Sequence, residues 1–372
     1  MKSFPVMLVA GILATAMGSM APAHSSHGNS KPTNLTGLHD FDFLVGEWDV
    51  RHRYLRAATN EWAETNGTCS NRALMDGWAN IEEHLLNAPS GAYHAIGLRA
   101  YDPKTGQWAI WWLDGRLPAG ALDPPLQGRF ENGVGTFYGD DTLDGKSIRT
   151  RFIWSHITPI SAQWEQAFSP DAGKTWETNW IMEFRRAGKK NLGISAAAMG
   201  SMAHSFQDSS KPAQAAANLT GLHDFDFLVG EWRVHHRRVK VDGHEWVEFD
   251  GTCSNRALME GWANIEEHLL NGPSGAYRAA GLRAYDPKTG QWAIWWLDGR
   301  YPAGALDPPV KGHFENGVGT FYSDYTHNGR PMRVRFIWSH ITTTSARWEQ
   351  ASSPDAGKTW DTNWVMEFRR VL

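Results

Sequence analysis

Cysteine is scarce in this sequence: only Cys69 and Cys253 occur among its 372 residues. They occupy equivalent positions of an internal repeat, so neither repeat can hold a disulfide of its own. Two interpretations stay open, namely one bridge between the repeats or two buried free thiols. No cysteine pair has the spacing of a metal or redox motif, and the sequence predicts neither a metal nor a cofactor.

An excess of basic charge is also lacking, because the formal net charge is −4. Binding to nucleic acid needs a basic surface that neutralises phosphates, so we exclude nucleic acid as a partner. The sequence has no Gly-x-Ser-x-Gly elbow, no phosphate loop, no dinucleotide fingerprint and no His-Glu-x-x-His motif. Motifs therefore leave the reaction, if there is one, undefined.

Apolar runs long enough to span a membrane are missing. The stretch from Phe4 to Met17 is too short for a span. Lys2 precedes it and Ala21-Pro22-Ala23 follows it, which is the pattern of a secretory signal peptide. We expect a signal peptide over residues 1–23 and a mature protein that is periplasmic or secreted.

Tryptophan, by contrast, is abundant, with 20 residues. Residues 34–186 align with residues 218–370 without a gap, and every tryptophan of the first copy recurs in the second. This duplication predicts two domains, 34–187 and 218–372, which could pack as an intramolecular pseudo-dimer. Residues 188–217 are expected to be a linker, since they resemble a degenerate second signal peptide.

Short runs rich in Trp, Phe, Ile and Thr, separated by turn signals such as Asn132-Gly133, predict strands. Eight to ten strands in about 150 residues indicate an all-β fold, either a closed up-and-down barrel or a sandwich. One short helix is expected near residues 38–44. The strands are expected near residues 47–54, 80–86, 107–113, 135–138, 149–156, 162–168 and 178–185.

Alternation along these runs predicts which side chains point into the barrel. Trp48, Val50 and His52 share one face of the first strand, and Trp154 and His156 share one face of a later strand. A small barrel is just wide enough to hold one ligand. The runs near residues 80–85 and 108–114 are apolar on both faces, so their direction stays open.

Histidines that recur in both copies are candidates for acid–base chemistry. His52 and His156 fall on predicted inward faces, with Glu82, Glu83 and Asp114 as available carboxylates. The other interpretation is that each histidine only donates a hydrogen bond to a neighbouring strand or loop. The candidate catalytic residues are His52, His156, Glu82 and Asp114, with His236, His340, Glu266 and Asp298 in the second copy.

The segment from Trp111 to Arg116 combines indoles with an Asp and an Arg at a strand end. Arg116 there could grip a carboxylate or stack on a ring, or it could simply pair with Asp114 to brace the turn. The predicted ligand-lining residues are Trp48, Trp112, Arg116, Trp154, Trp164 and Trp180, with Trp232, Trp296, Arg300, Trp338, Trp348 and Trp364 in the second copy.

Gly46-Glu47-Trp48, together with Arg185-Arg186, resembles the lipocalin-type signature. The run from His39 to Trp48 (HDFDFLVGEW) further resembles a bacterial domain of unknown function related to the calycins. The resemblance covers both repeats and implies two tandem lipocalin-like antiparallel β-barrels. It also implies that the first-strand tryptophan packs against the late arginine and closes one barrel end, and it carries no settled activity.

Two further resemblances add little. Some small calycin barrels bind haem through a late-strand histidine, here His156 or His340, but the glycine-rich signature of those barrels is missing after Trp48. The run from Ser169 to Trp176 matches the Asp-box of sialidase-type propellers, where it is a structural hairpin, and we interpret it as such.

The Trp-rich inward faces and the export signal favour a protein that binds a small apolar or aromatic molecule in each barrel. The alternative is a cofactor-independent enzyme, such as a lyase, isomerase or hydrolase, that uses histidine as acid and base. A third hypothesis is a packing module in which tryptophan fills the core.

Overall fold

The computed structural model of the protein describes residues 34–188 and 218–371, apart from residues 57, 58, 89, 90, 121, 144, 241–244, 305 and 328. The expected signal peptide and most of the expected linker lie outside the described residues, so both stay predictions. None of the helices in the described part has the length and hydropathy of a membrane span.

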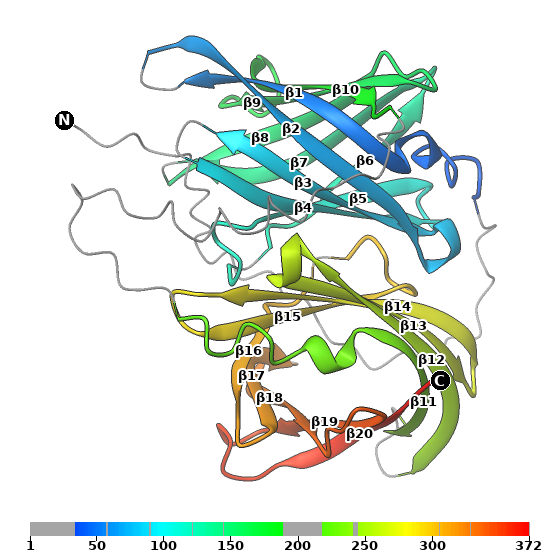
Figure 1. Cartoon of the computed structure of the whole chain (residues 1–372). Coiled ribbons are helices and arrows are strands. Elements are labelled where there is room, and N and C mark those ends of the chain that lie inside the picture. The colour runs from blue at the N-terminus through cyan, green and yellow to red at the C-terminus, as the bar shows by residue number, and fades with distance from the viewer. Residues whose placement is uncertain are drawn as a thin grey trace.

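Two closed antiparallel barrels of ten strands each make up the described residues (Figure 1). This confirms the all-β prediction and the tandem barrels. The first barrel consists of η1 (Asp42–Leu44), β1 (Gly46–Arg56), β2 (Glu61–Leu74), η2 (Met75–Gly77), β3 (Ala79–Ala88), β4 (Gly91–Asp102), β5 (Gln107–Asp114), β6 (Leu126–Glu131), β7 (Val134–Leu143), β8 (Lys146–Ser155), β9 (Ser161–Ser169) and β10 (Glu177–Arg186).

The second barrel repeats this order of elements. It consists of η4 (Asp226–Leu228), β11 (Gly230–Val239), β12 (Trp246–Leu258), η5 (Met259–Gly261), β13 (Ala263–Gly272), β14 (Gly275–Asp286), β15 (Gln291–Asp298), β16 (Val310–Glu315), β17 (Val318–His327), β18 (Arg330–Ser339), β19 (Ser345–Ser353) and β20 (Asp361–Arg370). Each strand pairs with its chain neighbours, and the last strand pairs with the first, so no sheet edge is left open. The expected helix near residues 38–44 shrinks to the single 3-10 turn η1.

One end of the barrel is closed by the contact that the lipocalin resemblance implies. Trp48 is buried and donates from Nε1 to the Leu44 carbonyl (2.6 Å). The Arg186 guanidinium lies 3.8 Å from the centre of the Trp48 ring and donates to the carbonyls of Val45 and Phe43, both at 2.7 Å. Arg186 therefore ties the last strand to the segment that enters the first strand.

The strands β3 to β5 include the runs that are apolar on both faces, and their two faces pack into two different cores. Inward side chains of β3, β4 and β5 face the lumen of their own barrel, whereas outward side chains such as Ile81, Leu98 and Trp111 pack against the second barrel. Figure 1 shows β3, β4 and β5 of the first barrel facing β13, β14 and β15 of the second. The shared apolar core explains why alternation is missing in these strands.

Reciprocal contacts relate the two barrels by a pseudo-two-fold axis. The Met75 amide donates to the Glu267 carboxylate, and the Met259 amide donates to Glu83 Oε2 at 2.7 Å. Such pairing of one patch with its own copy is the pattern of an isologous dimer interface. The duplication therefore produces a covalently linked pseudo-dimer.

Candidate ligand site inside the barrel

Two buried histidines form the centre of the candidate site. His52 of β1 is 1% exposed and His84 of β3 is fully buried. Their ring centres lie 6.4 Å apart, and we call this pair the imidazole centre. Both ring nitrogens of His52 and Nδ1 of His84 are buried without a hydrogen-bond partner among the described residues, whereas Nε2 of His84 lies 3.3 Å from Glu82 Oε1. Because such a nitrogen loses its hydration without compensation, the centre is a polar site in which the protein leaves three nitrogens unpaired.

Aromatic side chains surround the imidazole centre. Trp112 lies 5.4 Å from the His84 ring, and Trp180 lies 6.0 Å from the His52 ring, measured between ring centres. Trp164 packs edge-on against Trp180 at 5.4 Å. The sequence prediction of a lumen lined by tryptophan is thus correct for these three indoles, whose counterparts in the second barrel are Trp296, Trp348 and Trp364.

A charged network lies next to His84, on the strands β3 and β4. Arg99 of β4 donates to Glu82 Oε1 at 2.5 Å and to Asn80 Oδ1 at 3.0 Å, and all three side chains are buried. Burial alone would raise the pKa of Glu82, but Arg99 and His84 together hold that pKa at about 2. The carboxylate is therefore ionised at neutral pH, and Arg99 balances its charge.

The network leaves no room for a side chain at the glycine beside it. Gly97 of β4 lies opposite Glu82, and a Cβ at Gly97 would collide with the Glu82 carboxylate. Any larger residue would force this carboxylate out of its contact with Arg99.

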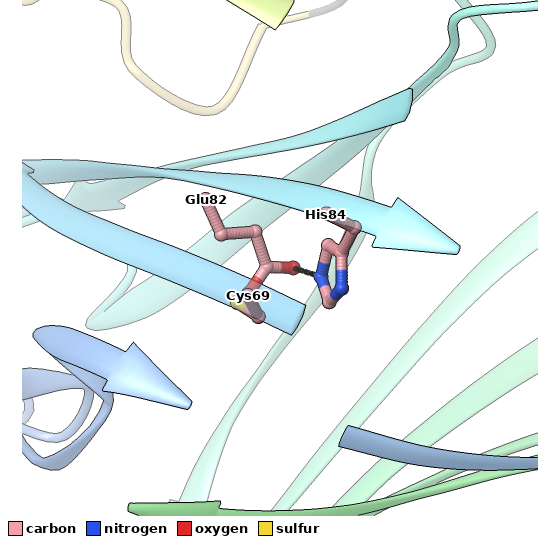
Figure 2. Close-up of side chains that lie close together, drawn as sticks. All are labelled: Cys69, Glu82 and His84. Carbon is pink, nitrogen blue, oxygen red and sulfur yellow. Dashed lines mark hydrogen bonds and ion pairs between the residues drawn. The ribbon is translucent and has the colours of Figure 1, made fainter. Parts of the chain in front are cut away.

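Cys69, Glu82 and His84 could in principle hold a metal ion, because one ligand atom from each lies within 4.8 Å of the others. Figure 2 shows the three side chains, with His84 Nε2 3.3 Å from Glu82 Oε1. Burial, followed by the Glu82 charge, raises the pKa of the Cys69 thiol well above its usual value. A protonated thiol and a carboxylate already paired with Arg99 make a poor metal site, since metal ligands must be deprotonated.

Both cysteines are free and buried, which decides between the two interpretations of the sequence in favour of unpaired thiols.

The protonation state of His52 follows from its surroundings. Burial, and secondarily the nearby His84, lowers the His52 pKa to about 3. At neutral pH the imidazole is therefore uncharged and offers one hydrogen-bond donor and one acceptor. His236 of the second barrel has the same depressed pKa, about 3, mainly because of burial.

His156 does not lie where the sequence predicted. The strand β8 ends at Ser155, and His156 adopts a left-handed turn with φ 52° that carries its exposed side chain out of the barrel. Its ring nitrogen Nδ1 lies 2.9 Å from Ser155 Oγ. His340 repeats this geometry, with Nδ1 3.0 Å from Ser339 Oγ. The expected inward orientation of both is wrong, and His84, which was left out of the predicted catalytic set, is the lumenal neighbour of His52.

Asp114 and Arg116 form the turn-bracing pair. Arg116 Nε lies 2.9 Å from Asp114 Oδ1, and the guanidinium stacks 3.8 Å above the Tyr93 ring centre. Asp298 and Arg300 do the same over Tyr277. A ligand carboxylate would have to displace this pair.

Two predicted ligand residues belong to the closed end instead. Trp154 packs against Phe184 at 5.2 Å, and Phe184 also touches Trp48 at 6.0 Å, within an aromatic core next to η1. Trp232 and Trp338 occupy the same places in the second barrel. We leave these four tryptophans out of the candidate site.

Two surface hollows of about 370 and 310 Å³ lie where the barrels meet. Glu267 and Arg278 line the larger one, and Glu83 and Arg256 line the smaller one. These hollows are distinct from the lumen and were not expected from the sequence.

No protein-family model matches this chain. None of the curated proteins matches it either. Among solved structures, a protein of unknown function from the DUF3598 family of Nostoc punctiforme is 12% identical, with 90% of this chain and 99% of that chain covered and a TM-score of 0.27. A mutant of transferrin binding protein B from Haemophilus parasuis is 7% identical, with 88% of this chain and 77% of that chain covered and a TM-score of 0.18. Neither likeness bears on function.

Proposed function

We propose that the protein binds a small aromatic molecule inside its barrels, at the imidazole centre. The unpaired ring nitrogens, namely both of His52 and Nδ1 of His84, are the observation that supports this proposal most strongly. A buried polar group without a partner costs about 1–3 kcal/mol, so it is retained where it serves a purpose. A ligand that pairs with these nitrogens recovers this free energy.

The surroundings define the ligand further. Trp112, Trp164 and Trp180 offer ring faces and edges, which favours an aromatic compound. His52 is uncharged at neutral pH, and Glu82 is already balanced by Arg99, so the site favours an uncharged ligand. We also infer export of the mature protein to the periplasm or beyond, on the signal-like segment over residues 1–23.

Intrinsic tryptophan fluorescence tests the proposal. The mature protein is titrated with aromatic compounds of increasing size, namely phenol, indole and 1-naphthol, and compared with the double variant His52→Leu, His236→Leu. We expect saturable quenching by at least one compound, and a loss of that quenching in the variant. The absence of saturable quenching across the panel, or undiminished quenching in the variant, would overturn the proposal.

A second candidate function is cofactor-independent catalysis on such a ligand. The observation that favours it is the buried contact between Glu82 Oε1 and His84 Nε2 (3.3 Å), because a carboxylate beside an imidazole can hold the ring in the orientation that a general base needs. The acid–base pair would then be His84 and His52 in place of His52 and His156. Turnover of the bound compound by the wild type tests this function, and full activity in the His52→Ala, His236→Ala variant would exclude it.

A further inference from the structure

The second barrel has its own imidazole centre, formed by His236 and His268, whose ring centres lie 6.4 Å apart. The two centres have the same histidines but differ in the residue on the neighbouring strand that faces His52 or His236. Thr65 of β2 lies beside His52 in the first barrel, and its counterpart in the second barrel, Phe249 of β12, lies beside His236. Both positions belong to the set of side chains that alternate into the lumen. The substitution therefore places an aromatic ring at one centre and a small hydroxyl side chain at the other.

In the second barrel this ring occupies the face of the imidazole. The rings of Phe249 and His236 stack in parallel, with centres 4.7 Å apart and an interplanar angle of 9°. Trp364 donates from Nε1 to His236 Nδ1 at 3.3 Å, which satisfies one of the two imidazole nitrogens. The second barrel thus covers one face of His236 and pairs one of its nitrogens from its own residues, while Nε2 of His236 has no hydrogen-bond partner among the described residues.

A second substitution between the two barrels covers the indole of Trp364. Arg238 replaces Tyr54, and its guanidinium lies 4.5 Å above the Trp364 ring while it donates to the Tyr277 hydroxyl at 3.3 Å. Trp364 is only 6% exposed, whereas its counterpart Trp180 is half-buried.

The first barrel has neither the stacked phenylalanine nor the hydrogen bond from the indole. Among the described rings, His52 has only His84 and Trp180 as neighbours, at 6.4 and 6.0 Å and inclined by 68° and 39°, so neither stacks on its face. Both nitrogens of His52 and Nε1 of Trp180 are without a hydrogen-bond partner in the described part of the chain. The first centre therefore lacks a stacked ring and a polar partner, both of which the second centre supplies from its own residues.

We propose that only the first barrel binds the ligand, and that the ligand is a monocyclic phenol. Its ring takes the place over His52 that Phe249 takes over His236. Its hydroxyl both donates and accepts, which suits an uncharged imidazole next to an indole N–H that needs an acceptor. This inference rests on the proposed function and narrows it from two sites to one, in contrast to the two sites that the duplication alone predicts.

Isothermal titration calorimetry of the mature protein with phenol tests this inference. We expect one site per chain, with toluene binding at least tenfold more weakly because it lacks the hydroxyl. Thr65→Phe is expected to weaken phenol binding at least tenfold, while the matched control Thr65→Ser keeps it. Phe249→Thr combined with Arg238→Tyr recreates the first centre in the second barrel and is expected to raise the stoichiometry to two.

Several results would overturn the inference. They are two phenol sites in the wild type, unchanged affinity in a Thr65→Phe variant whose near-ultraviolet circular dichroism shows native packing, or toluene binding as tight as that of phenol. If phenol fails to bind while 1-naphthol or indole quenches the tryptophans as described above, this inference falls and the proposed function stands. The gain of a site in the second barrel keeps the test valid even if Thr65→Phe does not fold.

Discussion

Replacing His52 by leucine should stabilise the protein. The imidazole is buried, and neither nitrogen has a partner among the described residues. Leucine has a similar volume and no polar atoms, so the substitution removes an uncompensated desolvation penalty. With about 1–3 kcal/mol per unpaired group, and some loss from imperfect packing, we expect the free energy of unfolding at pH 7 to rise by about 1–3 kcal/mol.

His52→Leu should also change how the free energy of unfolding depends on pH. Burial lowers the pKa of His52 to about 3 in the folded state, against about 6.5 when unfolded, so the unfolded chain binds the proton more tightly. The wild-type protein therefore keeps its full free energy of unfolding above pH 6.5, where the imidazole is neutral in both states, and loses part of it as the pH falls toward 3. The loss is about 2 kcal/mol between pH 7 and pH 5, so the advantage of His52→Leu over the wild type should grow by that amount.

Urea unfolding followed by tryptophan fluorescence at pH 7, 6 and 5 measures both effects. Glu82, His84 and Arg99 also face the centre, but they are the same in both proteins and cancel in the comparison. His39→Leu is the matched control, since His39 is exposed, and should change the unfolding free energy by less than about 0.5 kcal/mol. A His52→Leu variant that is destabilised by more than about 1 kcal/mol, with the pH slope of the wild type, would refute the argument that the imidazole is unpaired.

Three further predictions concern the framework of the barrels. Arg99→Met should lower the free energy of unfolding by about 3–5 kcal/mol in urea titrations, because it leaves the buried Glu82 charge uncompensated; a loss below about 1 kcal/mol would contradict this. Arg186→Ala should lower the melting temperature through a loss of about 1–2 kcal/mol, since it removes the stack on Trp48 and its carbonyl contacts; an unchanged melting temperature would argue against closure by this residue. Ile81→Asp with Ile265→Asp should separate the barrels and raise the radius of gyration in small-angle X-ray scattering, and unchanged scattering would contradict the shared core.

Much of the fold could be predicted from the sequence because local patterns determine it. Alternation identified the lumenal face of β1, and the Trp48–Arg186 contact followed from a known resemblance. The outward faces of β3 to β5 could not be assigned, because their partner is the other barrel and no local pattern records a contact between distant segments. Their uninterrupted hydrophobicity is the signal that such a partner exists.

The candidate site was predicted only in part. His52, Trp164 and Trp180 followed from alternation, whereas Trp112 was proposed from its place near a strand end in a run that alternation could not orient. His156 was misplaced since the strand ends one residue earlier than its pattern suggested. The interaction between Phe249 and His236 depends on the register of two paired strands, which the sequence does not show by itself.

A crystal structure of the protein with the tightest-binding aromatic compound tests the central claim most directly. The account predicts density for the compound in the lumen, with a polar atom about 3 Å from a ring nitrogen of His52 or His84. Density only in the hollows between the barrels, or a lumen in which ordered water pairs with these nitrogens and the compound is absent, would contradict it.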